Sequence, residues 1–62
     1  MSAPQPDDIY ISPAGAEVRV DRVTSDHVYF MVWDVGEETG VPKRMTPSLF
    51  ATTMEMHGMV RK

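Results

Sequence analysis

The sequence predicts a small α+β domain that is mainly β: an antiparallel meander of three to five strands with one C-terminal helix or helical turn. Three observations support this fold class. Residues 17–23 alternate between apolar and polar side chains, as a half-buried strand does; turn residues separate the apolar segments; and residues 46–58 carry the boundary signals of a helix. A chain of 62 residues has room for one domain, which we expect at residues 9–62.

The N-terminal residues 1–8 are expected to be a disordered leader, since Pro4, Pro6 and two aspartates accompany few apolar side chains. Residues 9–11, Ile-Tyr-Ile, then predict a first short strand. The sequence Ser-Pro-Ala-Gly at 12–15 has proline and glycine placed as in a tight turn, so we expect the strand to end there.

Residues 16–23 and 27–34 are predicted to pair as a hairpin across the polar turn at 24–26. Strict alternation in the first of these strands places one set of polar side chains on a common face: Glu17, Arg19 and Asp21. The opposite face then receives the remaining side chains: Ala16, Val18, Val20 and Arg22.

The segment 34–40 contains two glycines and three acids, and it predicts an acidic reversal of the chain. Residues 41–45 follow as a short strand. Pro42 indicates an edge position for this strand, because proline cannot donate a hydrogen bond to a ladder.

The last third of the chain predicts a helix that has Thr46 as its N-cap, Pro47 at its first position and Gly58 at its end. The competing interpretation is one helical turn at 47–51 followed by a strand at 54–60, because adjacent β-branched threonines weaken a helix. The expected core combines apolar residues of the hairpin and the helix: Val18, Val20, Val28, Phe30, Val32, Leu49, Phe50 and Met54.

The composition argues against several classes of protein. The chain has no cysteine and a formal net charge of −3, which removes thiolate metal sites and disfavours a general nucleic-acid binder. No apolar run approaches the length of about 18 residues that indicates a membrane span, and the N-terminus lacks the pattern of a secretory signal. The expected location is therefore the cytoplasm.

Catalytic motifs are weak. Ser25, Asp26 and His27 are the residue types of a hydrolytic triad, but consecutive residues cannot converge on one another as triad members do. We therefore expect no catalytic residues, no cofactor and no enzymatic activity.

The strongest functional indication is the strand at residues 27–33, with the sequence HVYFMVW. Both of its faces are apolar or aromatic, and a chain this short has difficulty burying both. Either the sheet and helix curl enough to hide both faces, or one face binds a partner. We expect a non-enzymatic interaction module or accessory protein that forms a homodimer or docks another protein through five residues: Tyr29, Met31, Trp33, Met45 and Met56.

Two other functions compete with this interpretation. A nucleic-acid module would stack bases on Tyr29 and Trp33 and contact phosphates with four basic residues: Arg19, Arg22, Lys43 and Arg44. A copper-binding protein would use thioether and imidazole ligands, which suit Cu(I), from one short segment: Met54, Met56 and His57. Its Met-x-Met pair resembles that of small β-barrel copper and silver chaperones.

The order of the elements also resembles a known family. The Ile9-Tyr10 strand, the SPAG turn, the HVYF strand and the TPSLF turn follow one another as in small SH3-like barrels of the Tudor and KOW type. The resemblance covers residues 9–60 and implies an SH3-like barrel. Domains of this kind also occur among short proteins encoded by bacterial prophages and plasmids.

Overall fold

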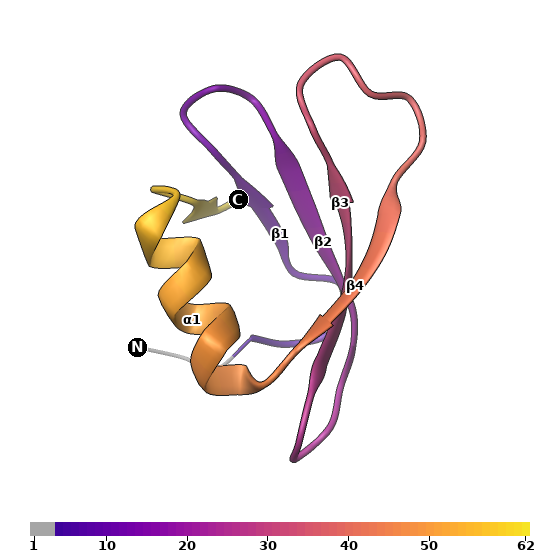
Figure 1. Ribbon diagram of the computed structural model, residues 1–62, viewed down its shortest axis with the longest axis vertical. Helices are drawn as coiled ribbons and strands as arrows, with labels where there is room; N and C mark the ends of the chain where they lie inside the picture. Colours follow the sequence, from indigo (N-terminus) through magenta and orange to yellow (C-terminus); the bar gives the residue numbers. More distant parts are fainter. Residues whose placement is uncertain (1–3) are drawn as a thin grey trace.

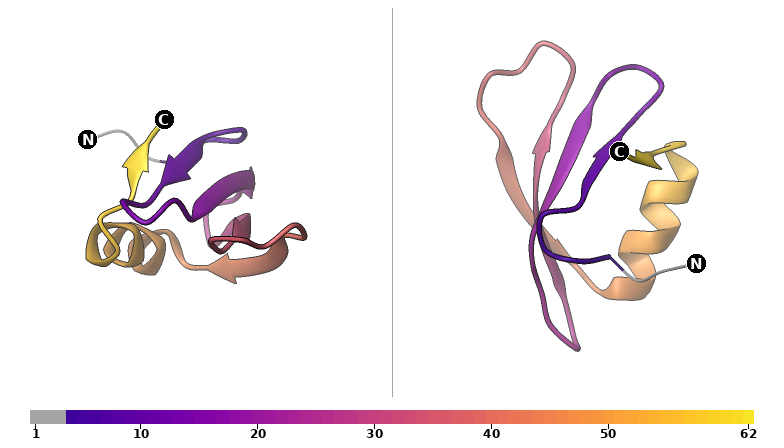
Figure 2. Two further views of the ribbon diagram at one scale, coloured as in Figure 1. Left: turned by 90° about the horizontal axis from the view of Figure 1, so that it is seen from above. Right: turned by 180° about the vertical axis from the view of Figure 1, so that it is seen from behind.

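The computed structural model describes residues 4–62, and they form one antiparallel sheet with a single helix against one of its faces (Figure 1). The order of the five strands across the sheet is β4-β3-β2-β1-β5. The predicted fold class is therefore confirmed, although the sheet is open rather than closed into a barrel. Figure 2 shows the sheet curving around the helix, which leaves the opposite face of the sheet without a covering element among the described residues.

The central hairpin joins β2 (Glu17–Val23) to β3 (Val28–Trp33), within a residue or two of the predicted boundaries. The Thr24 hydroxyl closes the turn by accepting hydrogen bonds from the backbone N–H of Asp26 at 3.3 Å and of His27 at 3.0 Å. Such a side-chain cap offers the turn's backbone the partners that the ladder cannot supply.

Strict alternation in β2 breaks after Val20. The register shifts between Val20 and Arg22, so Val20 pairs with Phe30 while Arg22 pairs with Tyr29. This β-bulge leaves Asp21 outside the pairing. The prediction that Arg22 shares a face with Val20 is therefore wrong, because the extra residue rotates Arg22 onto the face of Tyr29.

The sheet continues beyond β2 with β1 (Ile9–Ile11) and then β5 (Val60–Arg61), which is the edge strand. These two strands pair antiparallel. A two-residue strand carries no periodic signal of its own, so β5 follows only from the return of the chain after the helix. Lys62 donates its backbone N–H to the Ile9 carbonyl at 2.7 Å and extends this pairing.

Part of the expected leader, residues 1–3, lies outside the described residues. Closer to β1, the backbone N–H of Asp7 donates to the Val20 carbonyl at 2.9 Å, and Val20 donates to the Asp8 carbonyl at 2.8 Å. Asp7 adopts a φ of 72°, a conformation that aspartate tolerates better than most residues. These bonds hold residues 7 and 8 against β2.

Helix α1 (Pro47–Met56) follows β4 (Val41–Met45) and confirms the longer of the two helical interpretations. Thr46 is the N-cap, and its hydroxyl accepts a hydrogen bond from the Leu49 backbone N–H at 3.2 Å. The helix ends before Gly58, which has a φ of 64° and can adopt this left-handed conformation without steric cost.

The core lies between α1 and the inner face of the sheet, the face turned toward the helix. Phe50 is central to it, with edge-to-face contacts to Tyr10 at 5.7 Å and Phe30 at 5.0 Å between ring centroids. The predicted core residue Leu49 is 52 % exposed, because α1 turns Phe50 and Met54 toward the sheet instead. The buried residues are Tyr10, Val18, Val20, Val28, Phe30, Phe50 and Met54, with Val32 packed beside them.

We expect Thr46→Ala to lower the free energy of unfolding by about 1 kcal/mol, because the substitution removes the N-cap acceptor. Urea unfolding followed by circular dichroism measures the loss. Thr52→Ala is the matched control: its hydroxyl donates to the Ser48 carbonyl within the exposed helix surface, and its removal should change stability by less than about 0.5 kcal/mol. Equal losses in both variants would contradict the capping role of Thr46.

Candidate functional site

The face of the sheet away from α1, here called the outer face, is built from alternate residues of β2, β3 and β4. Directly paired residues of an antiparallel sheet share a face, so the register places eight side chains together: Glu17, Arg19, Arg22, Tyr29, Met31, Trp33, Pro42 and Arg44. On β1, Ile9 and Ile11 continue the face, since they pair with Arg19 and Glu17.

The row along β3 is the apolar centre of the outer face. Tyr29, Met31 and Trp33 are all partly exposed, whereas Val28 and Phe30 on the inner face are buried. The sequence prediction of a two-faced strand thus holds for the positions of these side chains. On this side the rings of Tyr29 and Trp33 contact arginines, and no helix covers them.

Two arginines lie over the aromatic rings. The guanidinium carbon of Arg22 is 4.3 Å from the centroid of Tyr29, and that of Arg19 is 5.3 Å from the centroid of Trp33. Cation–π contacts at exposed positions contribute about 0.5–1 kcal/mol. The guanidinium groups lie over apolar ring surface, so the face is amphipathic.

One end of the outer face, here the basic end, surrounds Tyr29. Arg22 and Arg44 both pair with Tyr29 in register, from the strands on either side. His27 adds a tilted ring contact to Tyr29, at 6.0 Å between centroids. Asp21 is exposed beside this end, at the bulge.

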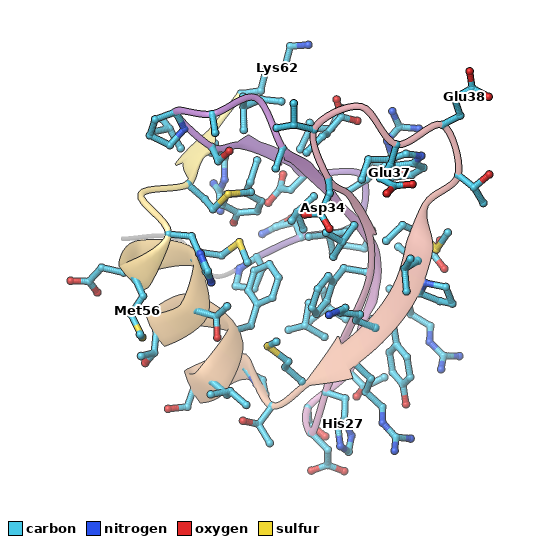
Figure 3. All side chains as sticks on the ribbon, turned by 45° about the horizontal axis from the view of Figure 1, so that its top comes forward. His27, Asp34, Glu37, Glu38, Met56 and Lys62 are labelled. Atoms are coloured by element: carbon cyan, nitrogen blue, oxygen red, sulfur yellow. The ribbon has the colours of Figure 1, made fainter. Side chains whose placement is uncertain are left out.

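The other end, here the acidic end, surrounds Trp33. Glu17 pairs with Trp33 in register and forms an ion pair with Arg19 at 3.2 Å. Asp34, Glu37 and Trp33 line the same shallow hollow. Figure 3 shows the acids of the β3–β4 loop at the end of the sheet opposite His27.

Trp33 is held tightly at the acidic end. A Cβ atom added at Gly40 would lie 2.6 Å from Cε2 and 2.7 Å from Cζ2 of the indole, and 3.1 Å from the Met31 methyl. Only glycine therefore allows the loop backbone to pass this close to the ring. Neither the glycine contact nor the bulge can be recognised from the local sequence pattern.

The inner face carries a second concavity, a groove of about 750 Å³ between the β3–β4 loop, α1 and the turn after β1. Its lining is mainly apolar and includes Val41, Met45 and Met59, with Lys43 and His57 among the polar residues. Sequence patterns did not indicate this groove, because it depends on where the helix leaves the sheet uncovered.

The structure separates several of the residues that the sequence grouped. Met45 pairs with Val28 on the inner face and packs against the core, and Met56 is 78 % exposed on α1 (Figure 3), so neither lies on the outer face. Lys43 pairs with Phe30 and also belongs to the inner face, apart from the other predicted phosphate contacts, Arg19, Arg22 and Arg44.

The copper-ligand candidates are also divided. Met54 is 7 % exposed and belongs to the core, while Met56 is directed to solvent on the same helix. His57 lines the inner groove together with Met54. Within residues 4–62, no group of three or more histidine and carboxylate side chains is arranged to hold a metal ion.

Arg61 lies on β5, at the edge of the sheet away from β4. Its guanidinium donates to the Tyr10 hydroxyl at 3.1 Å and forms an ion pair with Asp8 at 3.3 Å. The hydrogen bond to Tyr10 raises the pKa of Arg61 above its ordinary value, and the charge of Asp8 acts in the same direction. This cluster ties β5 to β1.

Fold and surface together define a small α+β domain with an open five-stranded sheet and an arginine-flanked aromatic face. No family model, no curated protein and no solved structure matches the chain. In the described part of the chain, none of the helical structure is long and apolar enough to cross a membrane.

Proposed function

We propose that this protein is a non-enzymatic interaction module whose contact surface is the outer face. The observation that carries the proposal is the row of Tyr29, Met31 and Trp33 on a sheet face that α1 does not cover. Tyrosine, tryptophan, methionine and arginine are the residue types enriched in the centres of protein interfaces. Here they adjoin one another on adjacent strands.

The same contacts argue against base stacking as the main use of this face. Arg22 and Arg19 already lie against Tyr29 and Trp33, so nucleotides would have to displace them to reach the rings. The net charge of −3 adds long-range repulsion of a polyanion. A protein surface can instead pack on the arginine stems as they stand.

Adjacent residues of β4 provide a matched test of the contact surface. Arg44 lies on the outer face and Lys43 on the inner face, and both are exposed. A photo-activated cross-linking amino acid is placed at either position in the full chain. We expect position 44 to give specific adducts, in purified protein or in the cells that express it, and position 43 to give none.

The outcomes of this cross-linking experiment are distinct. Adducts from position 44 alone support the proposal, and adducts to RNA or DNA at that position would replace it with the nucleic-acid function. Adducts from position 43 alone would move the contact surface to the inner groove. Absence of adducts from position 44 would overturn the proposal.

A further inference from the structure

We infer that the occupant of the outer face is a second copy of this chain, docked face to face with its strands antiparallel to the first. This inference rests on the proposed function and names the partner that the face binds. It follows from the separation of charge along the face. Two copies of the face bring opposite charges together only when their strands are antiparallel.

The charges divide along the strand direction. At the basic end Arg22 and Arg44 outnumber Asp21, so this end carries a net positive charge. At the acidic end Glu17, Asp34 and Glu37 outnumber Arg19, so this end carries a net negative charge. Tyr29 and Trp33 are four residues apart on β3, or about 13 Å at the rise of a strand. This exceeds the Debye length of about 8 Å at physiological salt, so each end presents its own sign of charge.

Face-to-face pairing by a two-fold axis leaves two simple choices. An axis parallel to the strands places the arginines of both basic ends together, with like charges opposed. An axis perpendicular to the strands, passing near Met31, makes the strands of the two copies antiparallel and places the basic end of each copy over the acidic end of the other. Arg22 of each copy then approaches Glu17 and Glu37 of its partner, and Tyr29 lies opposite the partner's Trp33, with Arg22 and the partner's Arg19 still against these rings.

The second arrangement is self-complementary, as an isologous dimer interface must be. Every charge contact occurs twice, and Met31 lies at the apolar centre between the two charged ends. Glu17 is 3.2 Å from Arg19 within one copy, and a carboxylate has two acceptor oxygens, so it can also accept from Arg22 of the second copy without leaving Arg19 unpaired.

The test exchanges charge between the two ends of β2 and measures solution mass by sedimentation equilibrium. Wild type should approach twice the 7.0 kDa of one chain as concentration rises. Arg22→Glu and Glu17→Arg should each raise the dissociation constant by about tenfold or more, since each opposes like charges twice. The double variant, with both exchanges, should restore the dimer.

Lys43→Glu is the matched control, because it makes the same change of net charge as Arg22→Glu on the inner face and should leave the dissociation constant within about twofold. Circular dichroism of each variant checks that the fold is retained. All three substituted positions are on the surface of the sheet, where such changes are usually tolerated.

Three results would overturn the inference: a monomeric wild type at all concentrations, a dimer indifferent to both single exchanges, or a double variant that stays dissociated. The cross-linking experiment separates these failures from that of the proposed function. Adducts from position 44 that are heavier than two chains would retain the outer face as a contact surface and replace the second copy with another protein.

Discussion

Phe50→Ala is expected to remove at least about a third of the protein's free energy of unfolding. The Phe50 ring is 1 % exposed and contacts the rings of both Tyr10 and Phe30. Truncating a buried phenylalanine costs about 3–5 kcal/mol. A 62-residue domain has roughly 3–9 kcal/mol of stability in total, so this one side chain accounts for a large part of it.

Leu49→Ala is the matched control for this prediction. Leu49 precedes Phe50 on the same helix but is 52 % exposed, and we expect it to change the free energy of unfolding by less than about 1 kcal/mol. Urea titrations at one fixed protein concentration are needed, because self-association would add a concentration-dependent contribution. Comparable losses in both variants would contradict the orientation of α1.

Gly40→Ala is expected to displace Trp33 and lower the free energy of unfolding by about 1–3 kcal/mol, as overpacking does. The new Cβ would lie 2.6 Å and 2.7 Å from two indole atoms, so the ring and the loop must move apart. The fluorescence emission of Trp33 should therefore shift. Because Trp33 lies at the acidic end of the outer face, the same variant should also weaken any contact made there.

Gly36→Ala separates this packing effect from backbone strain. Gly36 has a φ of 84°, and a Cβ added there would meet nothing within 4 Å, so alanine costs about 1 kcal/mol through its left-handed conformation alone. We expect the emission of Trp33 to stay at its wild-type wavelength. A shift in both glycine variants would indicate a general loosening of the β3–β4 loop instead of a clash at Trp33.

Local signals predicted most of the elements because their causes are local. Ile9–Ile11 and Val41–Met45 are strands at the predicted bounds, and Thr46, Pro47 and Gly58 have the predicted roles at the ends of the helix. Caps, turn residues and side-chain alternation act over a few residues. They need no information from distant parts of the chain.

The errors occur where distant segments decide the outcome. Helical spacing alone does not determine which of two adjacent apolar residues faces the sheet, and the structure selects Phe50 over Leu49. Tyr10 is buried in a strand too short to show alternation, because α1 supplies its ring partner. β5 exists only because the chain returns beside β1.

The candidate site has the same mixed origin. Alternation was sufficient to place Tyr29, Met31 and Trp33 on one face, but it assigned Arg22 to the other. The bulge after Val20 brings Arg22 over Tyr29, and the pairing of β4 with β3 adds Arg44 to the same end. The charge separation on which the dimer inference depends is therefore a product of register.

The amino-acid sequence by itself determined the segments that form β1 to β4, the N-terminal end of the helix, and the two apolar faces of β3. Only the tertiary structure decided which face α1 covers, where the register shifts, and how charge is arranged beside the aromatic row. The physical reason is the range of the interactions. Backbone preferences and periodicity act between near neighbours, whereas covering a sheet face depends on the packing of segments that are far apart in the chain.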